Sequence, residues 1–193
     1  MLGDIDSGSP TRALTSPRHV RTVPRVRVLG IDPGTRVLGY GVVAQHGTHL
    51  RALSHGTISP GGAMALEQRL RLIHLGITQV IAAHAPEVVA IEGLFSHKNA
   101  RSALVLGHAR GVALLCAAQA GLSVFEYAPA EVKKAVGAGG RAEKDQVVAM
   151  VKRLLGIDRI DKADAADALA LAVCHLNRRR FDARVRAAVE GGR

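Results

Sequence analysis

The sequence predicts an α/β domain in which helices flank a mixed five-stranded sheet. Short apolar runs, bounded by Gly, Pro and other turn residues, recur along the chain and are typical of strands. The first three runs follow one another through short turns, so we expect them to pair antiparallel. The later runs are separated by segments of helical periodicity, which favours parallel crossovers. The expected order is β-β-β-α-β-α-β-α-α.

Each element rests on its own local pattern. The segment 64–86 has apolar residues at spacings of three and four, which predicts an amphipathic helix, and Pro86 ends it. The segment 99–120 is a long Ala-rich run without strand alternation, so we expect a second helix. The other elements are strands at 26–31, 39–45, 49–58, 88–93 and 123–128, and helices at 142–155 and 164–176.

Composition indicates a globular, strongly basic protein. The chain has 193 residues, which suits one domain, and 48% of them are hydrophobic. Its formal net charge is +10, which suggests a polyanionic partner, nucleic acid before membrane. A soluble basic protein without such a partner is the alternative. No window of about 18 consecutive apolar residues occurs, so we expect no membrane span.

The two cysteines predict a reducing compartment. Cys116 and Cys174 lie in apolar, helical runs and lack the spacing of a zinc site. Buried free thiols in the cytoplasm are the simplest interpretation.

The ends of the chain differ in composition from the middle. Residues 1–24 are rich in Ser, Thr, Pro and Arg without a sustained period, and we expect a disordered extension. Residues 178–193 contain six Arg and two acids, which predicts a basic C-terminal tail or a frayed helix. The expected folded domain is 25–177.

Four acids stand at positions where apolar segments begin or end. Asp32 ends the first strand and Glu92 the fourth, while Asp164 and Asp167 open the last helix on one face. If the first and fourth strands are neighbours, these carboxylates meet at one edge of the sheet. Clustered carboxylates repel one another and bind Mg²⁺ or Mn²⁺ to offset the repulsion. Two such ions about 4 Å apart are a common device for phosphodiester hydrolysis.

Each acid also has an ordinary structural alternative. Asp32 precedes Pro-Gly and would suit a turn. Glu92 would suit an ion pair with a nearby Lys or Arg. Asp164 would suit a helix N-cap, and Asp161 competes both for that position and as a ligand, because it lies three residues earlier.

Two segments are candidates for contact with DNA. The segment 133–144 combines glycines with basic residues, so it can approach a phosphate backbone closely. The segment 93–103 follows Glu92 and contains an aromatic residue that could stack on bases or wedge between them. A solvated linker and a buried core Phe are the alternatives. The candidate contacts are Phe95, Lys98, Arg101, Lys133, Arg141 and Lys144.

Two glycines interrupt the long helix at 99–120. Gly107 and Gly111 are four residues apart, and glycine weakens a helix, so we expect a close approach of another element. Core packing and a dimer surface both remain open.

Several segments in the same order resemble the RuvC family of bacterial Holliday junction resolvases. The resemblance covers roughly residues 26–177. It is carried by GIDPGTRVLGYGVV, AIEGLF, KNARSALVLGHARGVAL, VFEYAPAEVKKAV, AEKDQV and DAADALALA.

This resemblance implies an RNase H-like fold and a structure-selective endonuclease. Such an enzyme nicks two strands of a four-way junction symmetrically during recombination and repair. It also implies a homodimer, Mg²⁺ as cofactor with two ions per active site, Mn²⁺ as a substitute, and cooperation with the RuvA–RuvB branch-migration complex. By resemblance, the catalytic and metal-binding residues are Asp32, Glu92, Asp164 and Asp167, and Phe95, Lys133 and Lys144 contact DNA or assist catalysis.

Three other functions account for parts of the sequence. The IDPGTR segment also resembles the phosphate loop of actin-like ATPases and sugar kinases, but those enzymes need two such domains to close on a nucleotide. A non-catalytic junction-binding protein would be expected to lack the acids. A nuclease of the RuvX/YqgF type acting on RNA fits the motifs less well.

Overall fold

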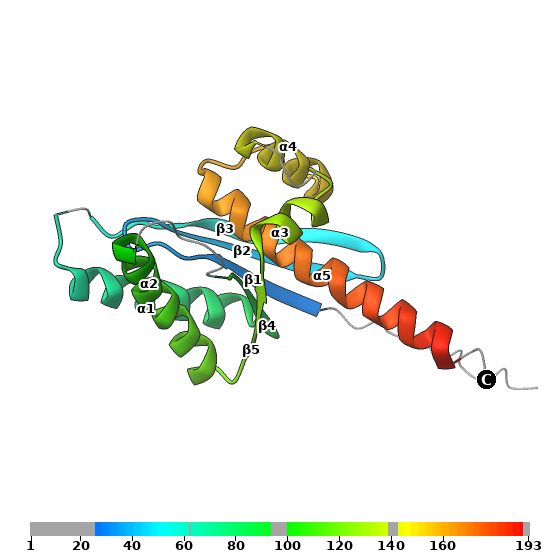
Figure 1. Cartoon of the computed structure of the whole chain (residues 1–193), viewed down its shortest axis with the longest axis horizontal. Helices are drawn as coiled ribbons and strands as arrows, with labels where there is room; N and C mark the ends of the chain where they lie inside the picture. The colour runs from blue at the N-terminus through cyan, green and yellow to red at the C-terminus, as the bar shows by residue number, and fades with distance from the viewer. Residues whose placement is uncertain (1–25, 62, 94–99, 139–142, 191–193) are drawn as a thin grey trace, which may run out of the picture.

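The computed structural model describes residues 26–61, 63–93, 100–138 and 143–190 (Figure 1). The expected extension at 1–24 lies outside them. One mixed sheet has the strand order β3-β2-β1-β4-β5. The pairs β1–β2 and β2–β3 are antiparallel, and β1–β4 and β4–β5 are parallel, which confirms the predicted directions. The strands are β1 (Val26–Asp32), β2 (Leu38–His46), β3 (His49–Ile58), β4 (Val88–Glu92) and β5 (Ser123–Tyr127).

Helices cover both faces of the sheet. Helices α1 and α2 lie against one face, and α3, α4 and α5 lie on the other (Figure 1). Each face has its own buried core: Leu29 of β1 packs with the α1–α2 side, and its neighbour Val28 packs with the α5 side. This alternation follows from the period of two along a strand. The helices are α1 (Leu66–His84), α2 (Ala100–Gln119), α3 (Pro129–Ala135), α4 (Lys144–Leu155) and α5 (Ala163–Glu190).

Helix α5 lies unusually close to the sheet. A Cβ atom placed on Gly30 of β1 would come 1.8 Å from the backbone carbonyl oxygen of Ala168. A Cβ atom on Gly39 of β2 would come 1.9 Å from the carbonyl oxygen of Asp164. Both distances are far below van der Waals contact with backbone atoms, so only glycine permits this approach. The strand glycines therefore fix the depth of α5.

The structure corrects two sequence expectations. Helix α3 is not among the predicted helices, and its last residues lie in the glycine-rich, basic segment 133–144. Pro129 fits its first turn, and the Ala128 backbone N–H donates to the Glu131 carboxylate at 3.0 Å; Ala at the N-cap hides this start in the sequence. Helix α5 does not stop at 176 but continues to Glu190, through most of the segment expected to be a basic tail.

The glycines of α2 do not mark core packing. A Cβ atom on Gly107 or Gly111 would meet nothing within 4 Å, so both positions face open space among the described residues. Of the two interpretations of this pair, packing inside the subunit is wrong.

Replacing Gly30 tests the constraint on α5. We expect Gly30→Ala to lower the free energy of unfolding by about 2–3 kcal/mol, because the new methyl group must push α5 off the sheet. Urea denaturation measures this. Gly61→Ala is the matched control, since its Cβ meets nothing within 4 Å, and it should change stability by less than about 0.5 kcal/mol. Equal effects of the two variants would contradict the constraint.

Candidate active site

Asp32 and Glu92 lie side by side at one edge of the sheet. Each is the last residue of its strand, and β1 and β4 are adjacent and parallel. Ile31 pairs with Ile91 in the register, so the following residues leave the sheet together. Parallel strands bring their carboxyl ends to the same edge, which explains why two acids 60 positions apart meet.

The close approach of α5 brings the other two acids to the same edge. Asp32 pairs in register with Gly39, and Gly39 is the residue against which the Asp164 backbone packs. Asp167 lies one helical turn further along α5, on the same face. The start of α5 is thus held directly over the end of β1.

Three of these four acids line a cavity of about 290 Å³, and Asp164 is not among its lining residues. Asp32, Glu92 and Asp167 line it together with two cations, Lys133 of α3 and Lys144 of α4. The rest of its wall is apolar and consists of Pro129, Val132, Val147 and Leu171. Acids and lysines therefore share a concave, partly apolar space at the carboxyl end of the sheet.

Asp32 is the electrostatic centre of this site. Burial, followed by the negative charges of Asp167, Glu92 and Asp164 in that order of size, raises the pKa of Asp32 from 3.8 to about 8. Lys144 acts in the opposite direction. The ionised form of Asp32 is therefore disfavoured until positive charge enters the site.

Asp167 is placed between acids and lysines. Burial raises the pKa of Asp167 and so does the charge of Asp164, while Lys144 and Lys133 lower it. Lys144 thus acts on both Asp32 and Asp167, and Lys133 acts on Asp167, so both lysines are counterions within the site.

The donor set suits a divalent cation, although within the described residues no three His, Cys, Asp or Glu side chains are grouped closely enough to hold a metal ion. Oxygen ligands of this kind are those that Mg²⁺ and Mn²⁺ prefer.

Asp161 lies apart from this group. Its exposed carboxylate pairs with the side chain of Arg159, outside the cavity. It is also absent from the charges that act on Asp32. This arrangement favours Asp164 and Asp167 over Asp161 as members of the site.

The predicted DNA contacts divide into three groups. Lys133 and Lys144 line the cavity. Phe95, Lys98 and Arg141 lie outside the described residues. Arg101 belongs to α2, and the structure does not describe its side chain.

Sequence reasoning missed the apolar wall and the helix that carries Lys133. Helix α3 supplies Pro129 and Val132 to the cavity, and the Asn177 side-chain amide donates to the Ala135 carbonyl at 3.0 Å, which ties α3 to α5. The signal that could have found α3 was Pro129 followed by Glu131, an acid in the first turn of a helix.

Among the helices of the described residues, none is long and apolar enough to cross a bilayer.

Comparisons with known proteins identify the family of this chain. The family described as crossover junction endodeoxyribonuclease RuvC matches residues 28–175. The protein of that name from Myxococcus xanthus (strain DK1622) is 56% identical over 154 residues, which cover 79% of this chain and 81% of the relative. Its counterpart from Trichlorobacter lovleyi is 52% identical over 152 residues, or 79% of this chain and 85% of the relative.

Solved structures give the same answer. The structure of T. thermophilus RuvC in complex with Holliday junction substrate matches with a TM-score of 0.76 and 34% identity, covering 81% of this chain and 96% of that one. The yeast mitochondrial resolvase Ydc2 is only 13% identical and shares the fold alone, with a TM-score of 0.56 over 82% of each chain. The fold is therefore RNase H-like, and the chain belongs to the RuvC family of crossover junction endodeoxyribonucleases.

Proposed function

We propose that this endodeoxyribonuclease resolves four-way DNA junctions by paired, symmetric, metal-dependent hydrolysis of two phosphodiester bonds. The observation that carries the proposal is the cavity itself, where Asp32, Glu92 and Asp167 face Lys133 and Lys144. Acids at the carboxyl ends of β1 and β4, with lysines opposite, suit a phosphodiester that enters together with its cations. Recombination and DNA repair are the processes that require this activity.

The four carboxylates would hold the cations. Asp32 lies between Glu92 on β4 and the two aspartates of α5, so it is the residue placed to bridge two ions. We expect Mg²⁺, two ions per site, with Mn²⁺ able to substitute. When bound, such ions supply a nucleophile at neutral pH and neutralise charge on the attacked phosphate and the leaving oxygen.

Lys133 and Lys144 are placed to contact the phosphate of a bound DNA strand. Lys144 and Lys133 already act on Asp167, and a phosphodiester entering the cavity would meet the same ammonium groups. There they would stabilise the additional negative charge of the transition state. Phe95, Lys98, Arg101 and Arg141 remain our candidates for contacts with the DNA outside the cavity, because they lie in the segments that follow Glu92 and precede Lys144.

We expect the dimer interface to lie on the exposed face of α2. This helix carries an exposed apolar strip on which Leu104 is 65% and Leu115 is 51% exposed, next to Gly107 and Gly111. Small residues beside exposed leucines allow two helices to approach closely. A homodimer across this face would present two active sites related by a two-fold axis, which suits two symmetric cuts.

Two further proposals concern the setting of the reaction. By family relation, we place this enzyme beside the RuvA–RuvB branch-migration complex. The cytoplasm is the expected compartment, and the buried free thiols of Cys116 and Cys174 are consistent with it.

A nicking assay tests the reaction and the choice of acids together. A labelled four-way junction and a matched linear duplex are incubated with Mg²⁺ or with EDTA. We expect paired nicks on the junction alone and only with Mg²⁺. Asp167→Asn should lower the rate by about two to three decades, because several kcal/mol of charge stabilisation are lost.

The control for this assay is Asp161→Asn, an acid of the same segment that lies outside the cavity. It should cleave within about twofold of the unmodified enzyme, since exposed ion pairs contribute little. Junction binding without cleavage under any metal would contradict the proposed nuclease. Equal losses in both variants would overturn the assignment of the acids.

The raised pKa of Asp32 predicts a pH-dependent stability in the metal-free protein. Between pH values of about 4 and 8 the folded protein binds this proton more tightly than the unfolded chain, so stability falls as pH rises. Asp32→Asn removes this loss. In EDTA the variant should be more stable than the unmodified protein by a few kcal/mol at pH 8, with little difference at pH 4.

Chemical denaturation across this pH range measures the difference between the two proteins. Adding Mg²⁺ at pH 8 should raise the melting temperature of the unmodified protein more than that of Asp32→Asn, because the variant has lost a charged ligand. A difference that does not vary with pH would show that Asp32 does not titrate as described.

Sedimentation tests the dimer face on α2. We expect the unmodified protein to sediment as a dimer and Leu115→Glu as a monomer, since a charge is placed on the apolar strip. Leu75→Glu is the control, because Leu75 is comparably exposed (42%) but lies on α1. The face is rejected if Leu115→Glu stays dimeric.

A further inference from the structure

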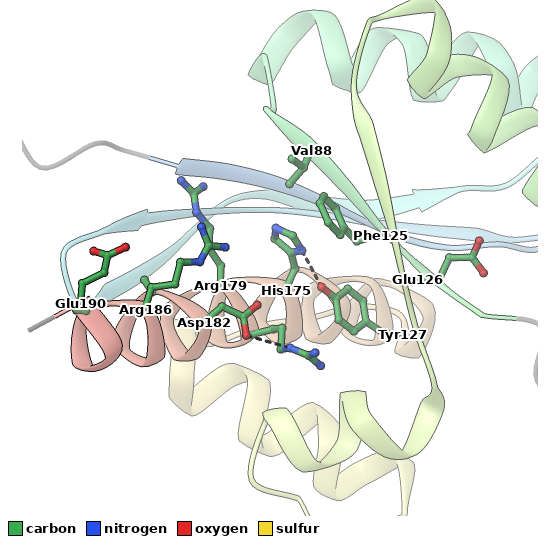
Figure 2. A pocket seen from close by; sticks show the side chains of 12 residues that line it. Val88, Phe125, Glu126, Tyr127, His175, Arg179, Asp182, Arg186 and Glu190 are labelled. Carbon is green, nitrogen blue, oxygen red and sulfur yellow. Dashed lines mark hydrogen bonds and ion pairs between the residues drawn. The ribbon is translucent and has the colours of Figure 1, made fainter. Parts of the chain in front are cut away.

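A second and larger cavity lies far along α5 from the catalytic one. It has a volume of about 830 Å³ and lies between the outer strand β5 and the C-terminal half of α5 (Figure 2). It shares no lining residue with the catalytic cavity. Its size is in the range of sites that bind ligands. The active site described above does not use it.

A buried histidine points a free ring nitrogen toward this cavity. His175 is 6% exposed, and its Nδ1 is hydrogen-bonded to the Tyr127 hydroxyl at 2.8 Å (Figure 2). Its Nε2 has no hydrogen-bond partner among the described residues. Burial lowers the pKa of His175, which favours the neutral ring. Its Nε2 is thus left to form a hydrogen bond with a ligand.

An aromatic ring on β5 adds an apolar surface. Phe125 packs on the His175 ring with 4.5 Å between centroids, yet it remains 42% exposed. Val88 and Ala183 extend this surface across the cavity. Large apolar side chains left half-exposed in a concave site are typical of binding surfaces.

Two arginines that line the cavity form no ion pair with a described acid. Arg178 pairs with Asp182 at 3.4 Å, but neither Arg179 nor Arg186 forms an ion pair with any described acid. Both line the cavity from α5 (Figure 2). They are seven residues apart, or about 10.5 Å along the helix axis. A ligand with two separated acids can therefore pair with each arginine separately.

Strand β5 offers the backbone groups that such a ligand would need. It is the outer strand of the sheet, and its residues Ser123, Phe125 and Glu126 are exposed. An extended segment can pair with an open edge of this kind through main-chain hydrogen bonds. Because Phe125 and Tyr127 both face the cavity, alternate side chains of an added strand would face it as well.

We propose that the β5 edge and this cavity bind an extended acidic segment of a partner protein. The segment has the pattern acid, any residue, apolar residue, any residue, acid. Its apolar side chain covers Phe125, and its acids, about 13 Å apart in a strand, reach Arg179 and Arg186 through flexible side chains. A backbone group of the segment also forms a hydrogen bond with His175 Nε2.

A peptide fits this site better than a DNA arm does. Glu126, Asp182 and Glu190 also line the cavity. A phosphate backbone carries a charge at every step and would meet these acids, whereas a peptide with two acids four residues apart can place neutral residues opposite them. Alternating apolar and acidic side chains match the alternation of apolar and basic groups in the wall.

Binding of a synthetic peptide to the full-length protein tests the proposal. The probe is fluorescein-labelled Thr-Ser-Glu-Thr-Ile-Thr-Glu-Ser-Thr, and its anisotropy is measured against protein concentration. We expect binding with a dissociation constant below about 1 mM. Arg186→Glu should weaken it at least about tenfold, because a buried charge pair is replaced by repulsion.

Arg184→Glu is the matched control, since Arg184 lies two residues away on the same exposed helix but outside the cavity. It should weaken binding by less than about twofold through long-range charge alone. Both variants should cleave junctions like the unmodified enzyme, which separates this site from the nuclease. No binding at about 1 mM, equal losses in both variants, or displacement of the peptide by a short DNA duplex would each overturn the proposal.

Discussion

The contact between α5 and the strand glycines is the constraint on which the rest of the structure depends. Without side chains at Gly30 and Gly39, the helix backbone rests directly on β1 and β2. This depth decides where the first turn of α5 lies, and that turn carries Asp164. Because Gly39 pairs with Asp32 in the register, one steric fact joins the sheet, the helix and the acids of the candidate active site.

Assembling acids in this way has an electrostatic cost. Burial and three neighbouring carboxylates raise the pKa of Asp32 to about 8, a shift that disfavours its ionised form. Lys144 of α4 offsets part of this shift, and Lys144 and Lys133 of α3 lower the pKa of Asp167 in the same way. Further positive charge in the site would favour the ionised form of both aspartates.

The two ends of α5 do different work. Its N-terminal half is buried between the sheet and α3–α4, and burying any charge there other than the acids of the site would be costly. Its C-terminal half extends past the sheet (Figure 1), and there arginines alternate with apolar residues on an open surface. A single helix thus connects the catalytic cavity with the cavity beside β5, and the Tyr127–His175 hydrogen bond ties the second cavity to the sheet.

The sequence by itself determined the five strands, their antiparallel and parallel directions, and Asp32 and Glu92 as strand-end acids, because these follow from local periodicity and from the position of acids after apolar runs. It left the adjacency of β1 and β4 as a condition, which the fold then met. It did not reveal α3, whose N-cap is Ala128 rather than Ser or Asp, and it ended α5 early, because the run of Arg after Asn177 resembles a solvated tail.

The spacing of the acids in the sequence also did not distinguish Asp161 from Asp164 and Asp167 as members of the site. Only the tertiary structure separated them, through the depth of α5 on Gly39 and the exposed pairing of Asp161 with Arg159. That depth depends on contacts between residues more than 100 positions apart, which no local pattern records.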